Sequence, residues 1–488
     1  MGAESRHRRD PSGPARETLV IRNPRDVYNF INDTPRKATR NRLMIFTALA
    51  SLLVDGWDTA GLSAGVPSLV ETFELSAFET GLLTSSIGFG MLFAAFVGGH
   101  LVDRIGRLRM FLLDMVLFVV AAIIGALAPN FAMVVVARFL MGVGIGIDVP
   151  AAMSVVAEQT NTRRKRTFVN QHMLFFYYAI VGSYLISWLL LEVGGVGNSL
   201  WRWQMAIGGV LAFIIIVTRL TVAEETAFWL ASRGHLRSAA GVIEKVYGVK
   251  VTIEAPAQPR AERRIPFTYF FRGKYLKRTI LSTEINFFQS LVYFAVGFYL
   301  PVTAGVLFDD PAVALLGTAA VQCAGLVGAV FASVFANRVG LRRETLIGFG
   351  VEVPALVVIG IGVVQGWMPP FVGIVVLAIF LMAHTLGPAQ TGVSIAVLSY
   401  PTEMRGRGTG LSYGVGRIGA IAGFYVFPLL LAPLGLGNTL LLLALAPLFG
   451  FLIALFVKWD PTGATSETEE SDEPGEPTGR PVGEGAAR

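Results

Sequence analysis

Hydrophobic residues run in long stretches along most of the chain, and short polar segments separate them. Twelve such stretches occur, and each holds the ~20 residues that an α-helix needs to cross the hydrocarbon layer of a bilayer. They lie at about 43–70, 80–101, 109–128, 131–157, 168–192, 202–222, 277–306, 312–336, 344–365, 370–398, 408–432 and 437–457. The pattern predicts an all-α, polytopic membrane protein with twelve transmembrane helices.

The polar segments divide the chain into five predicted parts. A longer one interrupts the apolar pattern in the middle of the chain, and we interpret it as a cytoplasmic linker with short amphipathic helices between two six-helix bundles. The parts are a basic N-terminal segment at 1–42, an N-terminal bundle at 43–222, the linker at 223–276, a C-terminal bundle at 277–458 and an acidic tail at 459–488. The tail is rich in Glu, Pro and Gly, so we expect it to be disordered.

Composition narrows the class of protein. Of 488 residues, 53% are hydrophobic and only 15% are charged, which argues against a soluble enzyme. Cys323 is the single cysteine of the sequence, so neither an intrachain disulfide nor a cysteine-rich metal site can form. No metal-ligand spacing or nucleophile motif stands at membrane depth, and we expect no metal or other cofactor and no enzymatic activity. The expected oligomeric state is a monomer.

The positive charges alternate between loops. Lys and Arg are retained on the cytoplasmic side of a membrane, so the alternation predicts a multi-pass protein of the cell membrane with both termini in the cytoplasm. This topology accounts for the net charge of +6 without a nucleic-acid partner. The opposite loops carry essentially only Arg202, with the acids Glu71, Glu74, Asp309 and Asp310. The basic loops hold Arg104, Arg107, Arg109, Arg163, Arg164, Lys165, Arg166, Arg338, Arg342, Arg343, Arg405 and Arg407.

A weak internal repeat supports two pseudo-symmetric halves. The loop after the second span reads Asp103-Arg-Ile-Gly106-Arg107, and the loop after the eighth reads Asn337-Arg-Val-Gly340. Equivalent loops of the two halves thus carry similar residues. Repeated halves with a substrate site at their interface are the architecture of many secondary transporters.

These residues resemble the major facilitator superfamily. Its loop signature is matched by Gly99, Asp103, Arg104, Gly106, Arg107 and Arg109. The resemblance implies an inner-gate charge network there, to which Glu158 and the loop arginines Arg338 and Arg405 also belong. Glu225 and Trp229 are similar to part of a further inner-gate motif of sugar porters.

Within the superfamily the chain resembles the sugar and metabolite proton symporters. Asp55-Gly-Trp-Asp58 looks like both a sugar-porter first span and the D-G-x-D of aromatic-acid symporters. Asp148 before Pro150 is similar to the phosphate and metabolite branch. The motifs therefore point to more than one substrate class.

The charges inside the apolar stretches are the candidate proton-coupling groups, because each costs on the order of 2.5–3.5 kcal/mol to insert. Asp58 and Arg138 differ in depth by only ~6 Å, so they can pair. The resemblance assigns these two positions to the proton-binding acid and its arginine gate. Asp55 and Asp148 are the alternatives as the titrating group.

The second half supplies the candidate substrate contacts Asn286, Gln289, Tyr293, His384, Gln390 and Arg417. Asn286 and Gln289 can hydrogen-bond hydroxyls, but the full sugar-porter signature is missing around them. Arg417 can clamp a carboxylate or pair with an acid of the first half such as Asp148. His384 either lines the cavity or hydrogen-bonds a backbone carbonyl.

Together these features predict a secondary transporter that moves a small organic or aromatic acid, or a related metabolite, by proton symport with alternating access. Its partners are then the solute, protons and the lipid bilayer. Direction is not encoded in the motifs, so a proton-driven exporter of a drug or secondary metabolite shares these residues. A sugar or phosphate symporter and a non-transporting sensor are further alternatives.

Overall fold

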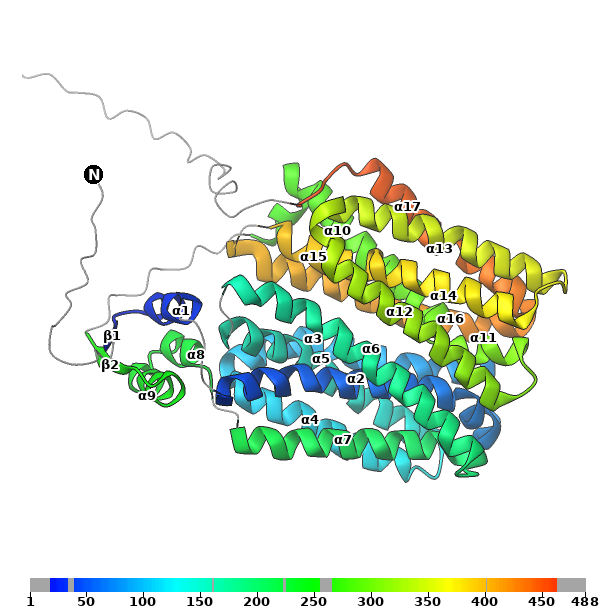
Figure 1. Ribbon diagram of the computed structural model, residues 1–488, viewed down its shortest axis with the longest axis horizontal. Coiled ribbons are helices and arrows are strands. Elements are labelled where there is room, and N and C mark those ends of the chain that lie inside the picture. Colours follow the sequence, from blue (N-terminus) through cyan, green and yellow to red (C-terminus); the bar gives the residue numbers. More distant parts are fainter. Residues whose placement is uncertain are drawn as a thin grey trace, which may run out of the picture.

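The computed structural model describes residues 18–33, 39–159, 162–222, 225–254, 266–400 and 402–462 of the chain. In this part the protein is a bundle of long helices in two groups that lie side by side (Figure 1). The first group contains α2 (Thr39–Phe73), α3 (Ala77–Ile105), α4 (Arg107–Ala126), α5 (Phe131–Gln159), α6 (Thr162–Glu192), η1 (Gly197–Ser199) and α7 (Leu200–Val222). The second contains η2 (Phe267–Phe271), α10 (Gly273–Val292), the π-helical turn η3 (Tyr293–Gly297), α11 (Leu300–Leu307), α12 (Pro311–Val339), α13 (Leu341–Val364), α14 (Pro370–Leu386), α15 (Pro388–Leu398), α16 (Thr402–Leu443) and α17 (Leu445–Phe456).

Twelve membrane-length segments can be traced within the described residues. Nine helical stretches are long and apolar enough to cross a membrane, and α10 with α11 makes a tenth. One of the nine runs from Gly406 to Phe456, and Gly435, with non-helical φ and ψ of 71° and 170°, divides it into two. The remaining segment is α2, whose 35 residues are more than long enough to cross a membrane. Six segments therefore fall in each group, as the sequence predicted.

The groups pack through close helix contacts. Within the first group, a Cβ on Gly142 would lie 2.1 Å from the Ile87 carbonyl oxygen, so the backbones of α5 and α3 touch. Between the groups, α3 packs against α16 and α6 against α12. These contacts bring α2 and α5 of one half next to α10, α14 and α16 of the other around the molecular centre.

Local sequence fixes the helix ends. Ser76 and Glu79 form a capping box at the start of α3, with the Ser76 amide donating to Glu79 at 2.9 Å and the Glu79 amide donating to the Ser76 hydroxyl at 3.2 Å. The repeated loops turn at glycines with left-handed φ, 112° at Gly106 and 97° at Gly340. The weak repeat in the sequence therefore corresponds to the same backbone turn in both halves.

Two spans of the second half are interrupted. The π-helical turn η3 ends α10, and α11 continues at an angle of 42°. Gly387 and Pro388 separate α14 from α15. Breaks of this kind inside a bundle are tolerated where backbone is covered by neighbouring helices or lines a cavity.

A small module outside the bundle joins the N-terminal segment to the linker (Figure 1). Strand β1 (Thr18–Ile21) pairs in parallel with β2 (Lys250–Ile253). Helices α1 (Pro24–Asp33) and α9 (Leu236–Tyr247) pack on the strands, and α8 (Ala227–Ser232) packs against these two helices. Its core includes Ile21, Val27 and Ile243, each fully buried. The side chains of Arg22 and Glu254 pair at 2.6 Å, which raises the pKa of the guanidinium. The end of the bundle that carries this module is called the basic end below.

Candidate functional site

A buried ion pair links α2 and α5 in the first half. Arg138 Nη1 lies 2.5 Å from Asp58 Oδ1, and the exposed fractions of the two side chains are 1% and 4%. The structure therefore brings together the two charges whose depths the sequence matched. Asp58 Oδ2 and the remaining guanidinium nitrogens of Arg138 have no further hydrogen-bond partner among the described residues.

Asp55 lies one turn from Asp58 and faces a cavity of about 190 Å³ between the two halves. The first half contributes Leu52, Asp55, Thr59, Met91, Ile145, Met173, Phe176 and Tyr177. The second half contributes Asn286, Gln289, Ser290, Tyr293, Phe294, His384, Ala389, Val393, Tyr413, Gly416 and Arg417. Five aromatic rings and the His384 imidazole thus surround a few polar groups, as in sites for small organic ligands.

Arg417 enters this cavity from α16. Asp55 of the other half attracts it electrostatically, but the two side chains do not form an ion pair. No side chain in the described part of the chain forms a salt bridge with Arg417. Glycines hold α16 against α10, since a Cβ on Gly419 would lie 2.2 Å from the Phe287 carbonyl oxygen. Close packing of these backbones positions the guanidinium in the cavity.

The other predicted substrate contacts have different surroundings. Gln289, Tyr293 and His384 line the cavity. Asn286 also reaches its wall, but the Asn286 amide nitrogen already donates to Ser282, Gly392 and Ser412 at 2.8–2.9 Å. The expectation that this amide is available to a sugar hydroxyl is wrong, because its hydrogens fasten α10 to α15 and α16. Gln390 is buried in α15 away from the cavity lining.

Asp148 pairs within its own half. Arg219 of α7 reaches Asp148 Oδ1 at 3.3 Å and Asp114 Oδ1 of α4 at 3.1 Å, with all three side chains fully buried. The alternative pairing of Asp148 with Arg417 is therefore wrong. Sequence reasoning passed over Asp114 and Arg219, although both stand inside apolar stretches. Asp58 and Arg138 were selected as charged residues inside apolar stretches, and Asp114 and Arg219 meet the same criterion.

His384 has an acidic partner rather than the backbone carbonyl that we considered. Its Nδ1 lies 3.1 Å from Glu352 Oε1 of α13, and the two side chains are 1% and 0% exposed. Glu352 was also missed, although it lies within the span predicted at 344–365.

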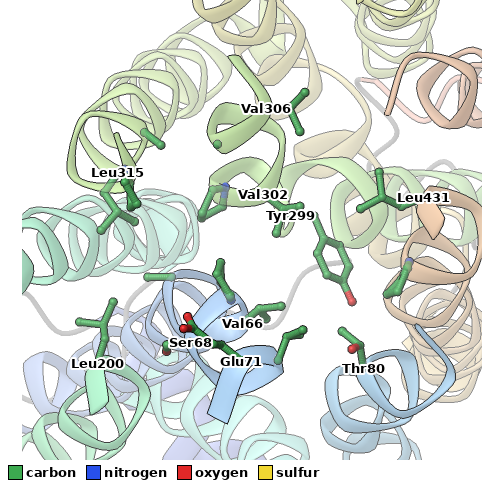
Figure 2. Close-up of a pocket in the computed structure, with 18 of the residues that line it drawn as sticks. Val66, Ser68, Glu71, Thr80, Leu200, Tyr299, Val302, Val306, Leu315 and Leu431 are labelled. Atoms are coloured by element: carbon green, nitrogen blue, oxygen red, sulfur yellow. The ribbon is translucent and has the colours of Figure 1, made fainter. Parts of the chain in front are cut away.

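Polar contacts join the two halves at the end opposite the basic end. The Tyr299 hydroxyl donates to Thr84 Oγ1 at 2.8 Å and to the Phe424 carbonyl at 2.9 Å. Ser63 donates to the Phe298 carbonyl and accepts from Tyr184. Beyond this layer lies a second, mainly apolar hollow of about 810 Å³ with Tyr299 and Ser68 in its wall (Figure 2).

The predicted inner-gate residues fall at the basic end. Gly99 lies in α3. The structure does not describe the side chains of Asp103, Arg104, Arg107, Glu158, Arg338 and Arg405. Arg109 is exposed at the start of α4. The Glu225 carboxylate accepts the Leu108 amide at 3.2 Å, next to Gly106, and so caps α4.

A family model for "Sugar (and other) transporter" matches residues 43–467. The chain belongs to this family. It is a multi-pass membrane transporter, not an enzyme, and its fold is that of the major facilitator superfamily.

Relatives and solved structures agree with this assignment. The chain is 26% identical to a putative metabolite transport protein YaaU of Escherichia coli, covering 82% of this chain and 88% of that one. It is 28% identical to the 4-hydroxybenzoate transporter PcaK of Pseudomonas aeruginosa (88% and 92%) and 24% identical to an arabinose-proton symporter of Bacillus subtilis (86% and 93%). The inward-open xylose transporter XylE of E. coli has the same fold, with a TM-score of 0.73 at 17% identity over 88% and 99% of the chains.

Proposed function

We propose that the protein is a proton-coupled symporter of a small aromatic carboxylate, with the basic end in the cytoplasm. The observation that carries the proposal is the Arg417 guanidinium, which faces a central, aromatic-lined cavity with no ion-pair partner among the described residues. A guanidinium binds a carboxylate in a planar, two-pronged geometry, and the surrounding rings suit an aromatic solute. The names of the relatives that carry 4-hydroxybenzoate and gallate support the same class.

Asp55 supplies a route to proton coupling. Its carboxylate and a bound substrate carboxylate would both be attracted to Arg417 from within one cavity. Two like charges so close together disfavour each other, so substrate binding favours the protonated form of Asp55. One proton and one anion would then load together.

The Asp58–Arg138 pair would connect this event to movement of the halves. Asp58 is one turn from Asp55 and outside the cavity lining, and Arg138 holds it against α5. Transfer of that same proton from Asp55 to Asp58 would release Arg138 and free α2 to shift against α5. Asp58 therefore remains a proton carrier in the proposal, next to the substrate-sensing Asp55.

Uptake into proteoliposomes tests the proposal. We expect labelled 4-hydroxybenzoate to accumulate only when the external side is more acidic, and Asp58→Asn and Asp55→Asn to abolish accumulation driven by the pH gradient. Arg417→Gln should lower uptake at least tenfold, because a charge-assisted pair to the ligand is lost. Arg407→Gln, on the exposed part of the same helix, is the matched control and should leave uptake unchanged.

Two results would contradict the proposal. One is accumulation that is insensitive to the pH gradient. The other is uptake of 4-hydroxybenzoate that Arg417→Gln does not change. Efflux from preloaded vesicles under an inward proton gradient would instead identify the exporter that the sequence left open.

A further inference from the structure

A second buried polar pair reaches the cavity from the C-terminal half. His384 of α14 lines the cavity, and Glu352 of α13 stands behind it, with 3.1 Å between Nδ1 and Oε1. Glu352 does not line the cavity, and its Oε2 has no donor among the described residues. His384 is therefore the one contact that satisfies this buried carboxyl group in the part of the chain that the structure describes.

The His384 ring is held in one orientation. It stacks on Tyr293 with 5.6 Å between ring centroids and 16° between planes, and on Phe380 at 6.2 Å and 22°. Glu352 holds the Nδ1 edge, and Nε2 has no hydrogen-bond partner within the described ranges. The Nε2 edge is thus the polar part of the ring left for a ligand.

The pair also determines what Nε2 can do. A net charge buried in the bundle is costly, so the pair is most stable when it is neutral and holds one shared proton between Nδ1 and Oε1. That proton sits either on the glutamic acid, with neutral histidine, or on an imidazolium facing a carboxylate. Nε2 carries a hydrogen in both arrangements, so His384 is a hydrogen-bond donor to the cavity.

We propose that His384 binds a second, oxygen-bearing substituent of the substrate, separate from the carboxylate on Arg417, and that Glu352 positions His384 for this contact. The two donors enter the cavity from different helices, α14 and α16. The preferred substrates are then ring-hydroxylated aromatic carboxylates. This inference rests on the proposed function and adds the specificity of that site.

Equilibrium binding to the purified full-length protein tests the inference through a ratio. The probes are 4-hydroxybenzoate and 4-methylbenzoate, which are alike in size and differ in the oxygen. The ratio is the Kd of 4-methylbenzoate divided by the Kd of 4-hydroxybenzoate. We expect it to be about ten in the wild type, because one good hydrogen bond contributes about this factor. His384→Leu should bring this Kd ratio close to one. Each ratio is internal to one variant, so a loss of folded protein does not change it.

Glu352 is tested by a double-mutant cycle. Glu352→Met should lower the ratio in the wild-type background and have no effect on it in the His384→Leu background, because Glu352 acts only through His384. The double variant also leaves no buried charge unpaired, so it keeps the test possible if His384→Leu fails to fold. Glu284→Met is the matched control, a buried carboxyl group of the same half away from the cavity lining, and should keep the wild-type ratio.

Three outcomes would overturn the inference: a wild-type ratio near one, a ratio that both the His384→Leu variant and the double variant retain, or an equal effect of Glu352→Met in both backgrounds. Failure of the proposed function has a different signature. We expect Arg417→Gln to weaken the binding of both acids equally and to leave the Kd ratio unchanged. If Arg417→Gln instead leaves both Kd values as in the wild type, the proposed function fails. If neither acid binds wild-type protein, both proposals fall.

Discussion

The pairing of buried charges separates structural from functional residues in this bundle. Arg219 lies between two carboxylates and away from the cavity, so both of its ion pairs are within the first half. Among the described residues, Arg138 pairs with one carboxylate, and Arg417 faces the cavity without an ion-pair partner. Of these three arginines, the one without an ion pair is thus the one best placed to meet a ligand.

Arg219→Leu should destabilise the protein strongly. The change leaves Asp114 and Asp148 buried without a cation, and breaking a buried pair in this way costs about 3–5 kcal/mol. Thermal unfolding of the purified protein measures the loss. The triple variant that adds Asp114→Asn and Asp148→Asn should recover part of the stability. An unfolding temperature equal to that of wild type in Arg219→Leu would contradict the structural role.

Sequence reasoning at this scale found charges but not all their neighbours. The Asp58–Arg138 contact was predictable from the sequence, because the positions of the two residues along their helices place them at similar depth in the membrane. Arg219 was passed over, and depth along a helix does not show which helices adjoin, so it could not have identified Asp148 as the partner of Arg219. The Asn286 amide looked available because two of its three acceptors come from residues more than 100 positions away, on α15 and α16.

Among the elements, α3 and α5 depend on backbone contact. Gly142 of α5 meets the Ile87 carbonyl, and Gly90 of α3 meets the Phe139 carbonyl, so each helix provides a glycine where the other comes close. Gly142 and Gly146 stand four residues apart on one face of α5, a spacing that lets a neighbouring helix come close.

Gly142→Ala should therefore lower stability, by about 1–3 kcal/mol for an overpacked contact. The added methyl group would lie 2.1 Å from a backbone oxygen, so the helices must separate. Gly182→Ala on α6 is the matched control, because a Cβ there meets nothing within 4 Å, and it should be neutral or slightly stabilising. Thermal unfolding of both variants tests this prediction. Equal unfolding temperatures for Gly142→Ala and Gly182→Ala would contradict the close contact of α5 with α3.

The hydropathy pattern predicted the membrane spans closely. It did not reveal the breaks within helices or the pairing of strands that are distant in sequence. The η3 turn and the Gly387 break lie inside stretches that remain apolar throughout. The β1–β2 pair joins two four-residue strands over 200 residues apart, too short and too distant for a periodic pattern to show. Tertiary contacts make these features, so a local pattern does not contain them.

At the scale of the whole molecule, the two halves touch through polar contacts at the end opposite the basic end. Tyr299 joins α3 and α16 in one hydrogen-bonded group, and Ser63 joins α2 to the segment before α11. The central cavity lies behind this layer. The twofold layout itself was predictable, because hydropathy and loop charge repeat over the full chain length.

Tyr299→Phe should shift the population toward a form that is open at that end. The variant loses the hydrogen bond to Thr84 of the other half, as well as the one to Phe424 of its own half, and keeps the ring stacked on Phe427. Spin labels at the exposed positions 198 and 309 report the change as a longer distance component in pulsed electron resonance. Tyr425→Phe on α16 is the control. Identical distance distributions in all three proteins would argue against this role for Tyr299.

The opposition of Arg417 and Asp55 across the cavity has an electrical consequence. In the proposed cycle, the carrier without substrate has a cationic Arg417 and an anionic Asp55 in the cavity wall, and the two charges balance. An anion and a proton that enter together leave the balance as it was, so the loaded and empty carriers have the same charge when the halves rock. A membrane voltage acts on moving charge, at about 2.3 kcal/mol per elementary charge for each 100 mV. It would do no work on this cycle, and accumulation would follow the proton concentration difference alone.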